Sequence, residues 1–293
     1  MRASIASRRV LAAISLVAAG AAAEDPIARG DAAWARRAEG HRGGQAAPGP
    51  ICEAVAAYEE ALRADPENLE ACWKLERALW FQADYASASS VEKEKLLDRG
   101  RKVAETALDR LYARAGSRER VEDLQPAAAA KALEALPAAV PLHVWAAVDW
   151  GLWGDVFGKV AAARQGVGTK VKRYGAIALA LDERHDSGAP HRVLGRLHAL
   201  APRIPFITGW VDREAAVRHL RRAVEIDADF LSNRLFLAEA LLDHFPARRG
   251  EALDLLRDLA RRTPGPEWQV EDSRTIEEAR ALLARLESAA TRP

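Results

Sequence analysis

The sequence contains few of the residues that build metal centres, disulfide frameworks or nucleic-acid surfaces. It has two cysteines and seven histidines, and the histidines do not follow the spacing of metal ligands. Its 43 lysines and arginines are balanced by 42 acidic residues, and the two kinds are interleaved along the chain. A basic patch of the kind that grips phosphates is therefore not indicated. We expect no metal, no cofactor and no nucleic-acid partner.

The familiar catalytic motifs are also missing. The chain has no G-x-S-x-G and no H-E-x-x-H sequence. The glycine-rich stretch QGVGTK, at residues 165–170, lacks both the Gly-Lys-Ser/Thr ending and the preceding strand of a phosphate loop. Because no nucleophile–base pair or metal constellation is available to carry a reaction, the sequence predicts a binding protein and not an enzyme.

Long apolar runs are confined to the N-terminus. Three arginines precede an apolar stretch at residues 10–19, and small residues follow it. This is the pattern of a secretory signal peptide, and the run is too short and too rich in alanine to be a membrane span. No cysteine follows it, so we expect no lipoprotein-type anchor. We expect residues 1–23 to be a signal peptide and residues 24–290 to form the folded domain, which in a Gram-negative source would be periplasmic.

Alternating β-type patterns are absent, whereas alanine, leucine, arginine and glutamate favour helices throughout. The stretch CEAVAAYEEALRADP, at residues 52–66, has the small–aromatic–small–proline spacing of the second helix of a tetratricopeptide repeat. Residues 68–85 continue with a first-helix pattern, and the repeat returns at 215–264. We predict an all-α, tetratricopeptide-like helical repeat, an α-solenoid of about four degenerate helix pairs, with a generic helical bundle as the alternative.

The two cysteines, Cys52 and Cys72, invite a disulfide in an exported protein. In a hairpin of antiparallel helices that turns at Pro66, Cys72 lies opposite roughly residue 61, which places Cys52 about nine residues, or ~13 Å, away along the helix axis. A disulfide needs Cα atoms within about 7 Å of each other. We therefore predict two free and mostly buried thiols.

Three of the eight tryptophans fall in one segment, HVWAAVDWGLWGDVFG, at residues 143–158. On a helix, Trp150, Trp153 and Phe157 share one stripe, while Trp145 lies about 100° away. Asp149 falls between the two. Each indole can bury up to ~250 Å², so leaving all three in water would be costly. Two interpretations stay open: an ordinary core helix, or the wall of a pocket or channel.

A carboxylate among aromatic side chains needs a cation or hydrogen-bond donors. The candidate partners of Asp149 are Lys172, Arg173 and Arg192, which belong to helices expected later in the chain. Such a pair would either line a pocket or fix the register of the helices, and the sequence does not distinguish these roles.

A second unusual segment is PRIPFITGWVD, at residues 202–212, which its prolines prevent from forming one continuous helix. We expect either a loop packed over a face of the repeat or a contact for a partner or ligand. Together with the tryptophan-rich helix, it completes the set of candidate ligand-binding residues: Trp145, Asp149, Trp150, Trp153, Phe157, Arg192, Phe206 and Trp210.

The order of these features resembles the T-component (TatT) family of periplasmic proteins associated with TRAP-type transporters. The resemblance rests on the leader, the early repeat AVAAYEEALRADPENLEACWKLERALWFQADY, the segment HVWAAVDWGLWGD, the stretch HRVLGRLHALAP and the tail HLRRAVEIDADFLSNRLFLAEALL. It covers roughly residues 27–264. It implies a helical-repeat protein that docks a periplasmic substrate-binding protein and holds a hydrophobic or organic-acid small molecule, in some members as a homo-oligomer.

Two other assignments use the same repeats. A cell-envelope assembly scaffold with no small-molecule ligand is one, because tetratricopeptide grooves usually grip peptide segments of other envelope proteins. The regulator-of-microtubule-dynamics group has a similar repeat layout, but the predicted signal peptide argues against it.

Overall fold

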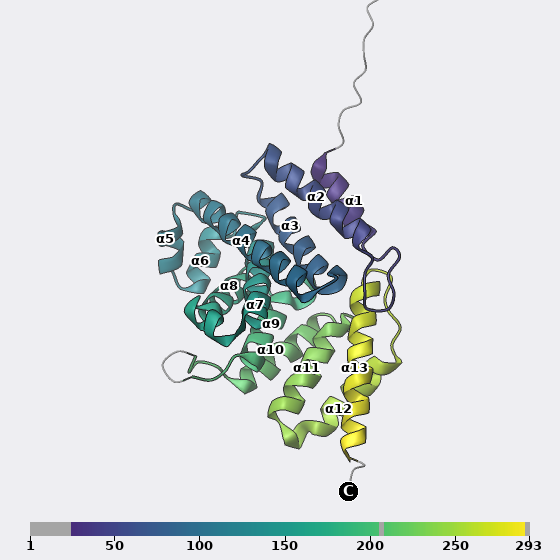
Figure 1. The fold of residues 1–293 in the computed structure, drawn as a ribbon. Coiled ribbons are helices and arrows are strands. Elements are labelled where there is room, and N and C mark those ends of the chain that lie inside the picture. The colour runs from purple at the N-terminus through teal and green to yellow at the C-terminus, as the bar shows by residue number, and fades with distance from the viewer. Residues whose placement is uncertain (1–24, 205–207, 291–293) are drawn as a thin grey trace, which may run out of the picture.

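The computed structural model describes residues 25–204 and 208–290 (Figure 1). The predicted signal peptide and Phe206 lie outside these residues. Within them the secondary structure is helical, apart from an isolated bridge between Arg42 and Gln45. The helices are α1 (Pro26–Ala35), α2 (Pro48–Ala64), α3 (Leu69–Phe81), the π-helical turn η1 (Gln82–Ala86), α4 (Ser90–Arg114), α5 (Arg118–Asp123), α6 (Pro126–Leu133), α7 (Ala139–Arg164), α8 (Val167–Leu181), α9 (His185–Leu200), α10 (Arg213–Ile226), α11 (Leu231–His244), the 3-10 turn η2 (Pro246–Arg248), α12 (Arg249–Arg261) and α13 (Gln269–Ala290).

Most helices pack against the next one in the chain, which produces the predicted all-α, tetratricopeptide-like helical repeat. Small residues lie where the helices meet. A Cβ added to Gly195 of α9 would stand 2.6 Å from Cγ of Leu220 on α10, and one added to Gly175 of α8 would stand 2.9 Å from Leu194. The missing side chains therefore set how closely these helices approach.

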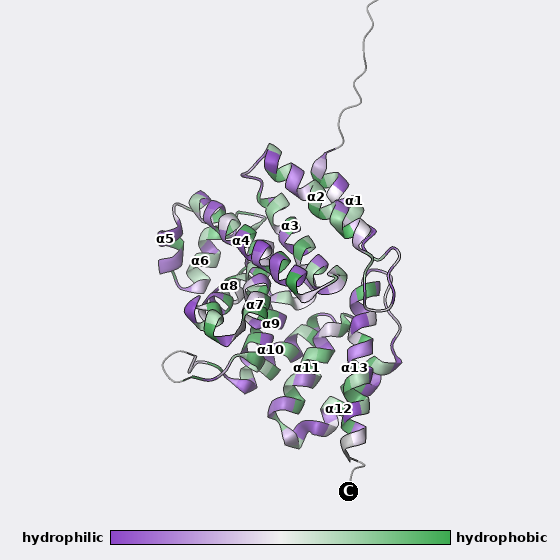
Figure 2. Ribbon diagram, in the orientation of Figure 1, coloured by the Kyte–Doolittle hydropathy of each residue, from purple (hydrophilic) through white to green (hydrophobic). Residues whose placement is uncertain are grey.

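Three large apolar clusters fill the interior. The first lies between α1, α2, α3 and η1 and includes Val270 of α13. The second extends from the start of α3 through α4, α5, α6, α7 and α8, and the third from the end of α9 to α13. Figure 2 shows the underlying pattern, in which apolar and polar positions alternate along most helices. This is the periodicity expected when one face of each helix is buried and the other is solvated.

The last helix returns to the beginning of the folded chain (Figure 1). Arg37, just after α1, forms a buried ion pair with Glu271 of α13 at 2.9 Å. Arg274 donates to the backbone oxygen of Gly44 at 2.6 Å. Contacts between residues more than 200 positions apart thus close the solenoid on itself.

The tryptophan-rich segment is helical up to Phe157 within α7, as expected, and neither Gly151 nor Gly154 breaks this helix. The helix bends at Gly158, whose φ of 86° lies in the region that favours glycine. No described helix, including the 26-residue α7, has the length and apolar character of a transmembrane span.

Both cysteines are free, as predicted, but only Cys72 is buried. The expectation that both thiols are mostly buried is wrong for Cys52. The buried positions of α2 include Ile51, Val55 and Tyr58, which recur at helical spacing. Cys52 stands one residue after Ile51, about 100° round the helix, and therefore points to solvent.

Candidate functional site

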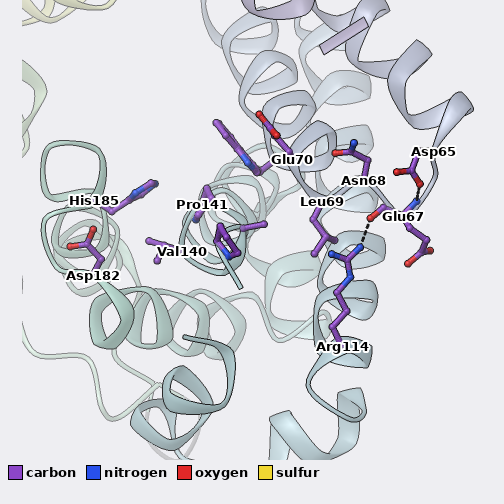
Figure 3. A pocket seen from close by; sticks show the side chains of 13 residues that line it. Asp65, Glu67, Asn68, Leu69, Glu70, Arg114, Val140, Pro141, Asp182 and His185 are labelled. Carbon is purple, nitrogen blue, oxygen red and sulfur yellow. Dashed lines mark hydrogen bonds between the residues drawn. The ribbon is translucent and has the colours of Figure 1, made fainter. Parts of the chain in front are cut away.

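A hollow of about 720 Å³ opens where several helix ends meet (Figure 3). We call it the Trp73 groove. One wall comes from the turn between α2 and α3 and the end of α4, the other from the turn between α8 and α9, with the start of α7 between them. It is lined by Asp65, Glu67, Asn68, Leu69, Glu70, Trp73, Arg114, Pro137, Ala138, Val140, Pro141, Asp182 and His185.

The α2–α3 wall is held by local hydrogen bonds. Asp65 ends α2, and its carboxylate accepts from the backbone N–H of Glu67 at 3.0 Å. Asn68 caps α3 by accepting from the N–H of Ala71 at 2.9 Å. Arg114 of α4 donates to the backbone oxygen of Glu67 at 2.6 Å, as Figure 3 shows. The wall is therefore fixed before any partner arrives.

The groove combines an acidic rim with an apolar lining. Glu70 is bridged to Lys74 at 2.6 Å, and Glu67 is bridged to Arg110 at 3.2 Å. The other two rim carboxylates, those of Asp65 and Asp182, stand on opposite walls in Figure 3 and have no ion-pair partner among the described residues. Apolar side chains with convergent polar groups are the usual composition of a binding site. The four rim carboxylates are those of Asp65, Glu67, Glu70 and Asp182.

The tryptophans singled out in the sequence do not line this groove. Trp150 is 1% exposed, and its Nε1 donates to Glu105 at 2.6 Å. Trp153 is 8% exposed and donates to Asp98 at 3.1 Å. Both rings belong to the large cluster around α4, α7 and α8. Their placement matches the core-helix interpretation, and a ligand-binding role for them stays a prediction.

The two aromatic stripes predicted for α7 make separate contacts. On one side, Trp153 stacks on Phe157 with centroids 4.6 Å apart. On the other side, Trp145 packs against Trp80 of α3 at 5.2 Å. Phe157 is 40% exposed, so this end of the stripe reaches solvent.

Asp149 is fully buried, and neither of its carboxylate oxygens has a hydrogen-bond partner among the described residues. Its electrostatic neighbour is another carboxyl, that of Glu76 on α3, which is equally buried and has no hydrogen-bond partner in the described part of the chain. Burial raises the pKa of both carboxyls well above the ordinary range, and the charge of Asp149 adds to the effect on Glu76. Gly100 of α4 also lies against this carboxyl, since a Cβ added to Gly100 would stand 3.0 Å from Oδ2 of Asp149.

The predicted cationic partners lie elsewhere, so that expectation is wrong. The ammonium of Lys172 lies over the ring of Trp210, 4.6 Å from its centroid. Arg173 donates to two backbone carbonyls at the end of α5. Arg192 is half-buried beside α11, where it pairs with Asp186 at 3.4 Å and donates to Asn233 at 3.1 Å. The sequence did not indicate that Glu76 would be buried near Asp149, because a glutamate in an amphipathic helix is usually on the solvent side.

Sequence reasoning also missed a histidine cluster between α9 and α10. Nδ1 of His191 lies 2.9 Å from Nδ1 of His219, and Nε2 of His191 lies 3.1 Å from Glu183. His198 stacks on His219, and burial, together with these neighbours, lowers the pKa of His219 to about 4. His191 and His198 are seven residues apart, which places them on one face of α9, and this spacing could have indicated the cluster. In the described part of the chain, no three His, Cys, Asp or Glu side chains are arranged to hold a metal ion.

No family model matches the chain, and no curated protein matches it either. Among solved structures, it is similar to a thermophilic tetratricopeptide-repeat protein of Thermus thermophilus, with 21% sequence identity and a TM-score of 0.35. That match covers 74% of this chain and 97% of the other. The described residues form an all-α helical repeat that carries an open groove with an acidic rim.

Proposed function

We propose that this protein is an exported helical-repeat binding protein that docks a partner protein in the Trp73 groove. The observation that carries the proposal is the groove itself, where an apolar lining meets a carboxylate rim on preorganised helix ends. Helical repeats commonly use such concave surfaces for peptide segments of other proteins.

The groove selects a particular chemistry. An apolar side chain of the partner would displace water from Trp73, Pro137 and Val140, the more accessible apolar residues of the lining. A lysine or arginine beside it would meet the unbridged carboxylates of Asp65 and Asp182. The preferred occupant is therefore a segment with an apolar residue next to a basic one.

The resemblance to T-components refines the proposal. On that basis the protein acts in the periplasm as an accessory of a TRAP-type uptake system, and the docked partner is the substrate-binding protein. The same resemblance adds a hydrophobic or organic-acid solute as cargo. The second candidate is an envelope scaffold that holds no small molecule, which is favoured by the burial of Trp145, Trp150 and Trp153 in the core.

A site-specific cross-link tests the docking site. A photo-crosslinking amino acid replaces Glu70, whose side chain is 56% exposed in the groove, in the full chain expressed in its own host. The matched control position is Glu134, 54% exposed and outside the groove. We expect the Glu70 position alone to capture a TRAP substrate-binding protein.

The captured pair is then purified and measured by calorimetry. Asp182→Lys should weaken binding by about tenfold or more, whereas Glu134→Lys should leave it unchanged. Capture of another envelope protein, with no solute in native mass spectrometry, would replace the TRAP accessory with the scaffold. Equal capture from both positions would show that the groove is not the docking site.

A further inference from the structure

A second surface of this protein combines exposed apolar side chains with an excess of basic ones. The large hydrophobic side chains that reach solvent among the described residues are Val91, Phe157, Val160, Leu200 and Ile204. All but Val91 come from two short segments, the end of α7 and the end of α9 with the stretch that follows it. Scattered exposure is ordinary, but clustering at one end of a molecule indicates a contact surface.

The two segments are neighbours in space. Gly154 of α7 contacts Val167 at the start of α8. The next residue, Gly168, faces Thr208 and Trp210, and a Cβ added to it would stand 3.6 Å from the indole of Trp210. Both segments therefore belong to one end of the molecule, on the lower left in Figure 1. We call this surface the α7–α8 tip.

The tip is rigidly supported. Phe157 stacks on the buried ring of Trp153, so its exposed side chain cannot fold back into the core. The bend at Gly158 then changes the course of the chain before the exposed Val160. On the second segment, the hydroxyl of Thr208 accepts from the N–H of Ile204 at 2.9 Å, which ties these two described residues together.

The tip carries an excess of basic residues. Residues 155–172, 199–204 and 208–212 together contain five basic residues and two acidic ones, Asp155 and Asp212, although the whole chain has 43 basic and 42 acidic residues. Lys170 is bridged to Glu105, but no carboxylate pairs with the other four within the part of the chain that the structure describes. Those four are Lys159, Arg164, Lys172 and Arg203.

We propose that the α7–α8 tip is a peripheral membrane-contact surface, which inserts its apolar side chains among lipids while its basic residues bind anionic headgroups. Protruding apolar groups ringed by lysine and arginine are the composition that binds such an interface. Trp210, partly exposed beside Lys172, is the residue type that favours the headgroup level. A second copy of the chain is a poor occupant, because two basic tips would repel each other.

Vesicle binding tests this inference independently of what occupies the Trp73 groove. The purified full chain is mixed with vesicles of phosphatidylethanolamine, with or without phosphatidylglycerol, and the bound fraction is measured by co-sedimentation. We expect binding only with phosphatidylglycerol, with loss as salt rises.

Two pairs of variants separate the contributions. Lys159→Glu with Arg164→Glu should weaken binding by about 25-fold or more, since each basic residue near an anionic surface contributes about a fivefold factor. Phe157→Ser with Val160→Ser should also weaken it, and should leave the salt dependence of the residual binding in place.

The matched controls are Arg249→Glu with Arg261→Glu, two exposed arginines of α12 with the same change in charge, and Val91→Ser. These should bind as the wild type does. Equal weakening by the α12 variant would show that net charge and not the tip drives binding. No binding to either vesicle, or concentration-dependent self-association through Phe157 and Val160 in place of binding, would overturn the proposal.

Discussion

Replacing Glu76 with glutamine should stabilise this protein, although most substitutions of fully buried residues destabilise. Glu76 and Asp149 are both 0% exposed, and within residues 25–204 and 208–290 neither has a hydrogen-bond partner. Each carboxyl is therefore buried without compensation, which costs about 1–3 kcal/mol for one unsatisfied polar group. In Glu76→Gln the second acid becomes a neutral amide, so the unfavourable effect of one carboxylate on the other is removed.

The effect depends on pH. Because the folded protein raises the pKa of both carboxyls, it binds protons more tightly than the unfolded chain does. The stability that this proton binding provides is complete below the ordinary carboxyl pKa of about 4, and it is lost as pH rises through the folded-state values. The gain from Glu76→Gln should therefore be small at pH ~4 and grow as pH rises through the folded-state pKa values, to at most about 1–3 kcal/mol.

Thermal unfolding followed by circular dichroism between these two pH values measures the effect, at about 2–4 °C of melting temperature per kcal/mol. The control is Asp98→Asn on α4. Although burial opposes it, hydrogen bonds from Lys102 and Arg101 hold the pKa of Asp98 below its usual range. That variant should lose stability at neutral pH, with a loss that shrinks on acidification. If Glu76→Gln instead destabilises at every pH, the carboxyls are not an uncompensated pair and the reasoning is refuted.

Three further outcomes follow from the packing. Glu271→Ala should cost about 3–5 kcal/mol in denaturant unfolding, because it leaves the buried guanidinium of Arg37 unpaired, and an unchanged midpoint would contradict closure of the solenoid by this pair. Gly195→Val should destabilise by about 1–3 kcal/mol or more, since its Cβ would stand 2.6 Å from Cγ of Leu220, and a Leu220→Ala background should recover part of the loss. Cys72 is buried, and desolvation raises the pKa of its thiol to about 11, so it should react with a thiol reagent only on unfolding. The exposed Cys52 should react in the native state, and two equal rates would refute the assigned burial.

The candidate site was harder to predict than the fold. The groove is lined by the end of α2, the end of α4 and the turn after α8, which are 40 to 120 positions apart in the sequence. Each contributes residues such as Asp65 or Asp182 that are ordinary at a helix end. No local pattern indicates that these ends converge, whereas the tryptophans of α7 attracted attention because aromatic clustering is visible in a single segment.

The sequence by itself determined the helical repeat, because apolar spacing and small residues such as Gly195 act over one or two turns and leave a local pattern. It also determined that Cys52 and Cys72 stay apart, since helix rise alone separates them. Tertiary structure decided which charges meet. Asp149 neighbours Glu76, and the cations predicted for Asp149 contact other groups instead. Arg37 pairs with Glu271 of α13. Each of these outcomes depends on how distant helices are placed. Electrostatic partners are set by that placement, and periodicity along the chain does not encode it.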